Sequence, residues 1–150
     1  MDNLAKARAL AVLVPAALLG GAYVSQYGFG LYPCEMCWWQ RYPHFVAVAL
    51  GLAGFVVKPA ARPLVILAGL AIIVSGAIGL FHAGVEYGWW EGITDCTARA
   101  PKGSAFDFGG QVVPCDVPQW TLWGLSLAGF NFLISGLGGA AVVALAAYRR

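Results

Sequence analysis

The segment LVILAGLAIIVSGAIGLFHAG, from Leu64 to Gly84, is the most informative stretch of the sequence. It contains no Lys, Arg, Asp or Glu. At about 1.5 Å per residue, a helix of this length crosses the roughly 30 Å hydrocarbon core of a bilayer. The segment therefore predicts a transmembrane helix.

Three further apolar stretches have the same character, near Ala9 to Tyr27, Trp38 to Val57 and Trp120 to Ala147. The 150-residue chain is 60% hydrophobic and carries only 16 formal charges, 9 from Lys and Arg and 7 from Asp and Glu, which nearly excludes a water-soluble globule. We predict an all-α membrane protein: one domain, residues 1–150, folded as a four-transmembrane-helix antiparallel bundle with two outer loops, the longer spanning about 85–119. A cleaved signal peptide is the alternative for the first stretch.

The charges predict an orientation in the membrane. Basic residues near the ends of spans stay on the cytoplasmic side, and six of the nine fall on one predicted face: Lys6, Arg8, Lys58, Arg62, Arg149 and Arg150. Both termini are therefore predicted to be cytoplasmic. The opposite face carries Arg41, Arg99 and Lys102, six of the seven acids, and all six Trp. A net charge of +2, scattered in this way, is too small for nucleic-acid binding.

Small residues recur every four positions in the third apolar stretch, at Ala71, Ser75, Gly79 and Ala83. Such a stripe lets a neighbouring helix approach closely. We expect it to pack inside the bundle, and a homodimerisation face is the alternative.

All four cysteines fall in the two predicted outer loops, and none in a span or on the cytoplasmic side. Two pairings suggest themselves, Cys34 with Cys37 and Cys96 with Cys115. Closing the larger loop would stabilise the fold by roughly 3 kcal/mol in the chain-entropy model, so a structural role is reasonable for Cys96 and Cys115. A C-x-x-C bridge closes almost no loop, and this spacing commonly holds a labile disulfide. We therefore predict that the Cys34–Cys37 pair is redox-active.

A zinc site is the alternative use of the cysteines. A four-cysteine site needs two close pairs, and Cys96 with Cys115 does not supply the second. Two histidines could complete a mixed site, but we expect His44 at an aromatic-rich boundary and His82 in the last turn of a span. No metal is therefore predicted.

Arg41 follows Cys37 by four residues, which places its guanidinium near the thiol at the outer lipid boundary. Snorkelling to lipid phosphates is one explanation for such an arginine. The other is functional, because a fixed cation and a helix N-terminus both favour a thiolate at Cys37. A dithiol at this depth needs an electron acceptor, and the chain has no haem, flavin or iron–sulfur pattern. A membrane quinone fits, with Arg41 as hydrogen-bond donor to its carbonyl oxygen.

The segment Cys34-Glu-Met-Cys37-Trp-Trp-Gln-Arg41 resembles the C-x-x-C-x-x-x-R signature of the disulfide bond formation protein B (DsbB) family. The four apolar stretches, the second cysteine pair, and His82 with Glu86 before the second loop are also similar. The resemblance covers nearly the whole chain. It implies an enzyme of the bacterial inner membrane that reoxidises the periplasmic thiol oxidase DsbA and reduces ubiquinone or menaquinone from the membrane pool.

The same resemblance implies a role for each site residue. Cys96 would be attacked by the partner's thiolate, and Cys115 would then attack Cys34. Cys37 would be the thiolate that meets the quinone, with Arg41 beside the ring. His82 lies near the position of a family histidine associated with quinone, and capping or packing of the third helix is its alternative role.

Two features depart from the family pattern, and a third bears on the relay. The short second loop argues against a membrane-lying helix there, and Glu35 adds a negative charge inside the C-x-x-C. The Gly-rich stretch from Gly103 to Gly110 would let Cys115 move towards Cys34.

Two other functions remain open from the sequence. The vitamin K epoxide reductase family also joins a four-helix bundle to a C-x-x-C and a quinone, but its C-x-x-C usually comes late in the bundle. A structural tetraspan protein with two inert disulfides is the alternative from another class.

Overall fold

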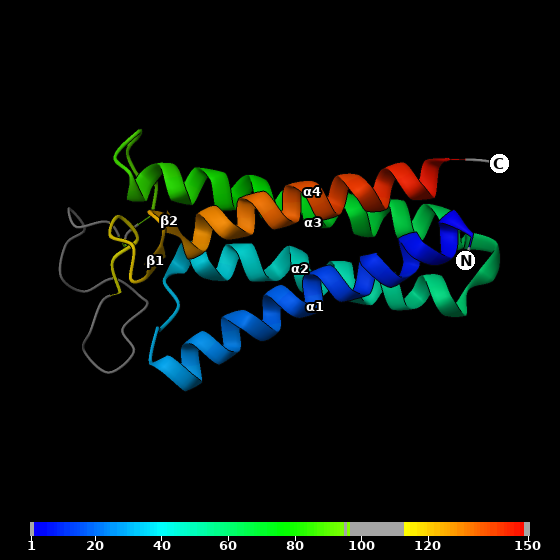
Figure 1. Cartoon of the computed structure of the whole chain (residues 1–150), viewed down its shortest axis with the longest axis horizontal. Helices are drawn as coiled ribbons and strands as arrows, with labels where there is room; N and C mark the ends of the chain where they lie inside the picture. The colour runs from blue at the N-terminus through cyan, green and yellow to red at the C-terminus, as the bar shows by residue number, and fades with distance from the viewer. Residues whose placement is uncertain (1, 95, 97–112, 149–150) are drawn as a thin grey trace.

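The computed structural model describes residues 2–94, 96 and 113–148. Four long helices run antiparallel to their neighbours in the chain (Figure 1). They are α1 (Asn3–Phe29), α2 (Glu35–Val56), α3 (Ala61–Glu86) and α4 (Leu127–Ala147); a 3-10 turn, η1 (Lys58–Ala60), joins α2 to α3, and a two-stranded hairpin, β1 (Thr121–Leu122) and β2 (Leu125–Ser126), precedes α4. The predicted helical bundle is confirmed.

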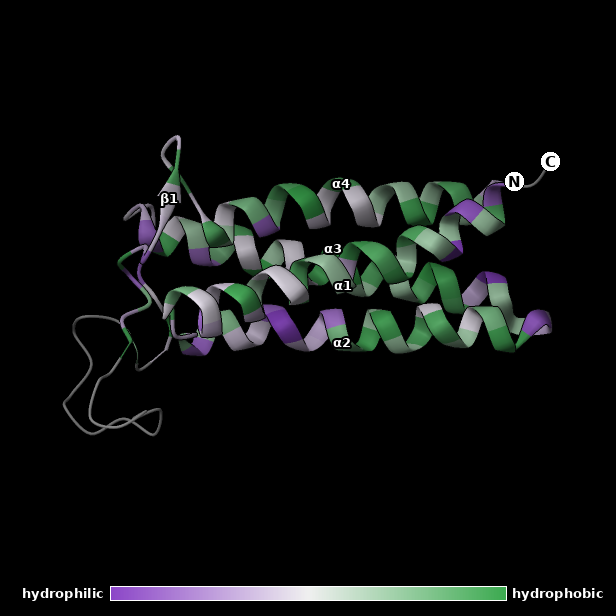
Figure 2. Ribbon diagram, turned by 60° about the horizontal axis from the view of Figure 1, so that its bottom comes forward, coloured by the Kyte–Doolittle hydropathy of each residue, from purple (hydrophilic) through white to green (hydrophobic). Residues whose placement is uncertain are grey.

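Three segments are long and apolar enough to cross a membrane: α1, η1 with α3 (Lys58–Glu86), and α4. Helix α2 has a comparable length of 22 residues, but it is not among these three segments. In Figure 2, hydrophilic colour marks the half of α2 that lies nearer the cysteines, which contains Gln40, Arg41 and His44. The structure is consistent with a helical membrane protein, and the passage of α2 through the membrane stays a prediction.

All four helices begin at other residues than the predicted stretches: α1 begins at Asn3, six residues before Ala9, and α3 begins at Ala61, three residues before Leu64. The starts of α2 and α4 each have a side-chain cap. Helix α2 begins at Glu35, three residues before Trp38, because Cys34 caps it: its Sγ accepts a hydrogen bond from the Cys37 backbone N–H at 3.1 Å. Cys37 therefore lies within the first turn of α2 and not in a loop. Helix α4 begins at Leu127, with the Ser126 side chain as its cap.

The residues before α4 form the hairpin instead of extending the helix. Trp123 and Gly124 both have positive φ values, 53° and 79°, which suit a tight turn between two strands. The Tyr87 hydroxyl donates to the Gly124 carbonyl and accepts from the Ser126 N–H, which ties the hairpin to the end of α3. Trp123, at the tip, is 92% exposed.

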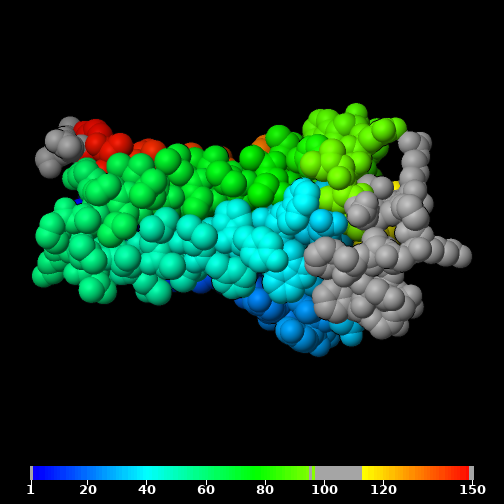
Figure 3. Space-filling view, turned by 180° about the vertical axis from the view of Figure 1, so that it is seen from behind, coloured from blue at the N-terminus to red at the C-terminus, as the bar shows by residue number. Residues whose placement is uncertain are grey.

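Helix α3 is the centre of the bundle and packs most extensively against α4 and then α2. Figure 3 shows α2 and α3 side by side along one face. A Cβ on Gly79 would lie 2.9 Å from the Ala128 carbonyl oxygen, so the backbones of α3 and α4 approach closely there. Ser75, Gly79 and Ala83 are buried. The expectation that the small-residue stripe packs inside the bundle is confirmed at these three positions, whereas Ala71 is partly exposed.

The two ends of the bundle differ in charge. The termini and η1 lie at one end (Figure 1), with four of the predicted cytoplasmic basic residues: Lys6, Arg8, Lys58 and Arg62. Arg62 donates to the Ala146 carbonyl near the end of α4. The cysteine-bearing segments lie at the other end. Arg149, Arg150, Arg99, Lys102 and the Gly103–Gly110 stretch lie outside the described residues, and the orientation in a membrane stays a prediction.

Candidate active site

Two disulfides lie at the end of the bundle away from the termini. Cys34 is bonded to Cys37, with their Cα atoms 5.0 Å apart. Cys96 is bonded to Cys115, with their Cα atoms 5.3 Å apart, and the Cys115 N–H also donates to the Cys96 carbonyl at 2.7 Å. Both pairings are those suggested by the sequence.

The two disulfides are neighbours although they lie far apart in the chain. The Sγ atoms of Cys34 and Cys115 and a ring nitrogen of His82 all lie within 4.8 Å of one another. All three residues are buried, and Met36 and Val85 pack in the same cluster as the cysteines. A set of two sulfurs and an imidazole could in principle hold a metal ion. With both disulfides intact, however, neither sulfur is the thiolate that binds metals.

Arg41 is buried between α1 and α2, with only 6% of its surface exposed. Its guanidinium donates to the Gln26 side-chain oxygen at 2.8 Å and to the Ala22 carbonyl at 3.3 Å. It also lies 4.8 Å from the ring centroids of both Tyr23 and Trp38. Helix α1 therefore fixes Arg41 inside the protein, and the snorkelling explanation does not fit the structure.

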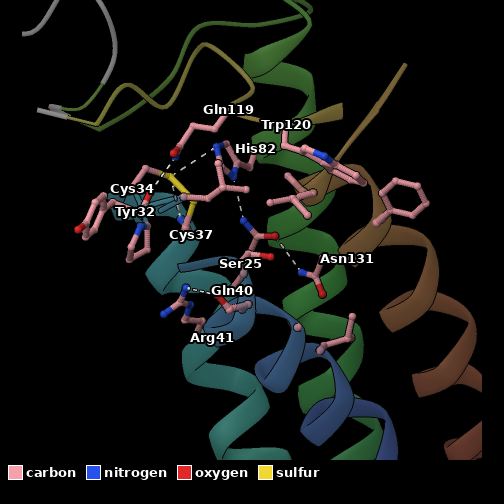
Figure 4. A pocket seen from close by; sticks show the side chains of 18 of the residues that line it. Ser25, Tyr32, Cys34, Cys37, Gln40, Arg41, His82, Gln119, Trp120 and Asn131 are labelled. Carbon is pink, nitrogen blue, oxygen red and sulfur yellow. Dashed lines mark hydrogen bonds between the residues drawn. A yellow bond between two sulfur atoms is a disulfide. The ribbon is translucent and has the colours of Figure 1, made fainter. Parts of the chain in front are cut away.

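His82, which projects from the last part of α3, lies beside the Cys34–Cys37 disulfide (Figure 4). Its Nε2 is 3.7 Å from Cys34 Sγ and 3.7 Å from the Glu86 carboxylate, and its Nδ1 is 2.9 Å from Gln40 Nε2. The Gln40 amide nitrogen also donates to the Met36 carbonyl, which fixes the orientation of that amide. His82 Nδ1 must therefore accept from Gln40, so Nε2 carries the proton and faces the sulfur and the carboxylate.

A layer of polar side chains crosses the bundle below the disulfide. This layer was not predicted from the sequence, and His44 was expected at an aromatic-rich boundary. That placement is wrong: His44 is 3% exposed and faces the bundle interior, because α2 is rotated so that His44 contacts Ser75 of α3 and Asn131 of α4. The layer, which we call the polar cluster, consists of Gln40, His44, Ser75, Asn131 and Ser135.

Hydrogen bonds connect the whole polar cluster to His82. Asn131 is the central member: its amide nitrogen donates to Gln40 Oε1 at 2.9 Å, and its oxygen lies 3.0 Å from His44 Nε2 and accepts from Ser135 Oγ at 2.7 Å. Ser75 Oγ donates to the Gln40 carbonyl at 2.7 Å. Polar residues four apart within apolar stretches, Gln40 with His44 and Asn131 with Ser135, were the available sequence signal.

A cavity of about 250 Å³ opens between α1, α2 and α4, next to the disulfide. Its polar lining includes Cys37, Gln40, Arg41, His44 and His82, as Figure 4 shows in part. Most of the remaining lining is apolar and comes from three places: Leu18, Leu19 and Ala22 of α1, Leu127 and Phe130 of α4, and Leu31, Pro33 and Trp120 at the mouth. The site thus combines an apolar cavity, a disulfide and a buried cation.

The comparisons with known proteins agree with one another. Residues 5–146 match the family described as disulfide bond formation protein DsbB. Two relatives named disulfide bond formation protein B are similar: one from Marinobacter nauticus is 28% identical over 142 residues (85% of this chain and 83% of the relative), and one from Chromohalobacter salexigens is 27% identical over 140 residues (79% and 81%).

An uncharacterised protein of Rickettsia prowazekii is 22% identical over 132 residues, which cover 83% of this chain and 77% of that protein. No solved structure matches significantly. Because the family match covers nearly the whole sequence, this chain belongs to the disulfide bond formation protein DsbB family.

Proposed function

We propose that this protein is a thiol:quinone oxidoreductase that reoxidises a periplasmic DsbA-like thiol oxidase and passes the electrons to membrane quinone. Each cycle would take two electrons and two protons from the partner's thiols, leave the partner with a disulfide, and convert one quinone to quinol. The observation that carries the proposal is the juxtaposition of two buried disulfides with an apolar cavity that contains a fixed arginine.

In this proposal all four helices span the bacterial inner membrane, with the termini cytoplasmic and the cysteine loops periplasmic. The packing of α2 supports its passage through lipid, because its polar residues Gln40, Arg41 and His44 are turned into the bundle. Its outward-facing side chains are largely apolar and include Phe45, Val46 and Leu52. The basic residues at the opposite end from the cysteines support the orientation.

The thiol relay would run through the two neighbouring disulfides. Attack of the partner's thiolate on Cys96 releases Cys115 as a thiolate, and attack of Cys115 on Cys34 then releases Cys37. A separation within 4.8 Å between the sulfurs of Cys115 and Cys34 supports this second exchange. The His82 Nε2 proton lies beside Cys34 Sγ and would orient that sulfur for the attack by Cys115.

The cavity residues fit a quinone, which would supply a two-electron, two-proton acceptor that dissolves in lipid. The apolar lining suits its ring, and the volume of about 250 Å³ is slightly below the range of about 300 to 1,000 Å³ found for small-molecule sites. Arg41 would donate to a quinone oxygen, since its hydrogen bonds to Gln26 and Ala22 of α1 leave other N–H groups of the guanidinium for a ligand. The choice between ubiquinone and menaquinone stays open.

Quinone absorbance against time tests the proposal, with detergent-purified protein and a reduced DsbA-like substrate. We expect thiol-dependent quinone reduction by the wild type and none by Cys37→Ser. Cys37→Ser should still form a mixed disulfide with the partner at Cys96, because that bond forms before Cys37 is released.

The matched control is Cys96→Ser, which should lose reduction with the protein partner. It should keep reduction with a small dithiol that reaches the Cys34–Cys37 disulfide directly. A folded wild type that reduces neither ubiquinone nor menaquinone would overturn the proposal and favour the structural tetraspan alternative. Undiminished reduction by Cys37→Ser would remove Cys37 from the electron path.

A further inference from the structure

The polar cluster determines which ring nitrogen of His44 carries the proton. Asn131 Nδ2 donates to the Ser75 carbonyl, which can only accept, so Asn131 presents its oxygen to His44 Nε2 at 3.0 Å. Ser75 Oγ is 2.9 Å from the same nitrogen, and it donates its single proton to the Gln40 carbonyl. Both neighbours of Nε2 are therefore acceptors, so Nε2 carries the proton and Nδ1 has a free lone pair.

His44 Nδ1 is buried and has no hydrogen-bond partner among residues 2–94, 96 and 113–148. A buried polar atom without a partner is uncommon in a folded protein. Protonation of Nδ1 would not resolve this, because the groups that contact the ring at Nε2, from Asn131, Ser75 and Ser135, are all uncharged. A cation without a counter-charge at this depth is costly. The arrangement therefore leaves an acceptor that only a hydrogen-bond donor can satisfy.

His44 lines the same cavity as the proposed carrier site. It follows Cys37 by seven residues and Arg41 by three, so the three residues lie along one face of α2. Arg41 and His44 are thus separated by about one helical turn, with opposite hydrogen-bonding character: the guanidinium only donates, and Nδ1 only accepts.

We propose that His44 distinguishes the two redox forms of the carrier by accepting a hydrogen bond from a hydroxyl group of bound quinol at Nδ1. The proposal rests on the proposed function. A quinone oxygen only accepts, so it can bond to Arg41 but not to His44 Nδ1. A quinol hydroxyl both donates and accepts, so the reduced form can bond to both residues. The site would thereby hold quinol more tightly and shift the bound carrier towards the reduced form by the same factor.

Two substitutions separate the acceptor from the structural role of the ring. In His44→Gln the terminal amide can take the place of Nε2 and donate to Asn131, but no acceptor stands at the position of Nδ1. In His44→Asn the side-chain oxygen can take the place of Nδ1, but the donor to Asn131 is lost. The Gln variant thus tests the acceptor, and the Asn variant should restore it.

The experiment measures dissociation constants for decylubiquinone and decylubiquinol by quenching of tryptophan fluorescence in detergent, under argon. All proteins carry Cys34→Ser and Cys37→Ser, so no electrons exchange with the ligand. We expect His44→Gln to weaken quinol binding roughly three- to tenfold, the effect of one hydrogen bond, and to leave quinone binding unchanged. His44→Asn should keep the preference for quinol while unfolding at a lower temperature.

Equal effects of His44→Gln on both ligands, or no effect on either, would overturn the inference and leave the proposed function intact. Failure of the wild-type site to bind either ligand would overturn the proposed function as well. If the His44 variants do not fold, the contact can still be tested by NMR on a protein that retains His44. The chain has two histidines, so ¹⁵N-histidine NMR can follow His44 Nδ1 directly: we expect quinol to shift its resonance and quinone not to, and the absence of that difference would overturn the inference.

Discussion

The half of the bundle nearer the termini is packed with apolar side chains, whereas the half nearer the cysteines contains the polar cluster. The buried core of the first half is entirely apolar and mostly small: Ala7, Ala11, Ala47, Val65, Ala68, Ile72, Val142 and Ala146. In the second half, five polar side chains from three helices bond to one another. Close packing of small side chains stabilises the half nearer the termini, whereas hydrogen bonds between side chains connect the helices in the half nearer the cysteines.

This difference shows how one bundle can contain both a scaffold and a site. Lipid offers no hydrophobic driving force between helices, so small residues that allow close packing are sufficient for the scaffold. Polar side chains at the same depth are costly unless every member is satisfied. In the polar cluster the side-chain amides of Asn131 and Gln40 form hydrogen bonds with most of the other polar groups. His44 Nδ1 is the exception: it has no partner among the described residues, and the proposed contact with quinol would supply one.

The largest stability effect is expected for Asn131→Leu, which keeps the number and branching of the side-chain heavy atoms but removes the centre of the polar cluster. Asn131 makes five hydrogen bonds, to Gln40, His44, Ser75 and Ser135. At about 0.6 kcal/mol for each bond in a membrane, their loss should lower the free energy of unfolding by about 3 kcal/mol. Reversible unfolding in mixed detergent micelles measures this change. An unchanged free energy of unfolding would show that packing alone stabilises both halves.

Arg41→Met should separate function from stability. Loss of a charged hydrogen-bond donor of about 2 kcal/mol predicts a roughly 30-fold fall in kcat/KM for quinone. The same substitution should not lower the free energy of unfolding, because Arg41 has no carboxylate partner among the described residues and burial of its charge is costly. Steady-state kinetics at varied quinone concentration and unfolding in detergent test the two halves of this prediction.

Arg41→Lys is the control for Arg41→Met. It keeps the charge but cannot reproduce both bonds to α1, so we expect an intermediate kcat/KM. If Arg41→Met lowers the free energy of unfolding by as much as the fall in kcat/KM corresponds to, the role of Arg41 is structural and the prediction is contradicted.

Helix identity could be predicted from the sequence because it depends on local patterns. The four apolar runs predict α1, α2, α3 and α4, and the cysteine spacing suggests both disulfide pairings. The start of α4 could not be predicted in this way: Trp120 to Ser126 contains no charged residue and continues directly into the apolar run, but Trp123 and Gly124 adopt positive φ values and the segment forms a hairpin. Apolar composition does not distinguish these two outcomes.

The site was predicted in part for the same reason. Cys34, Cys37, Arg41 and His82 lie close together in the sequence or match a family pattern, and they line one cavity. The polar cluster joins residues up to 91 positions apart, and its contacts depend on how α2, α3 and α4 are rotated against one another. The position of His44 was therefore wrong, although its i, i+4 relation to Gln40 was visible.

A matched pair of glycines tests the packing of the scaffold half. A Cβ on Gly139 would lie 2.8 Å from the Gly69 carbonyl oxygen and 3.0 Å from the Ile73 backbone nitrogen, whereas a Cβ on Gly136 would meet nothing within 4 Å. We expect Gly139→Ala to lower the free energy of unfolding by about 1.5 kcal/mol, because backbone atoms must move. Gly136→Ala, on the same helix, should leave it unchanged or slightly higher. Equal effects in unfolding measurements would contradict the close approach of α3 and α4.

The smallest effect is expected for Ser135→Ala, which removes a single donor at the edge of the polar cluster. Ser135 Oγ donates to Asn131 Oδ1, so its loss should cost about 0.6 kcal/mol in the wild-type background. In the Asn131→Leu background that acceptor is already absent, so Ser135→Ala should cost nothing. A double-mutant cycle of unfolding free energies measures this coupling directly. Additive effects would mean that the two residues stabilise the bundle independently, and the polar side chains would then act as separate local contacts and not as one network reaching from Ser135 to His82.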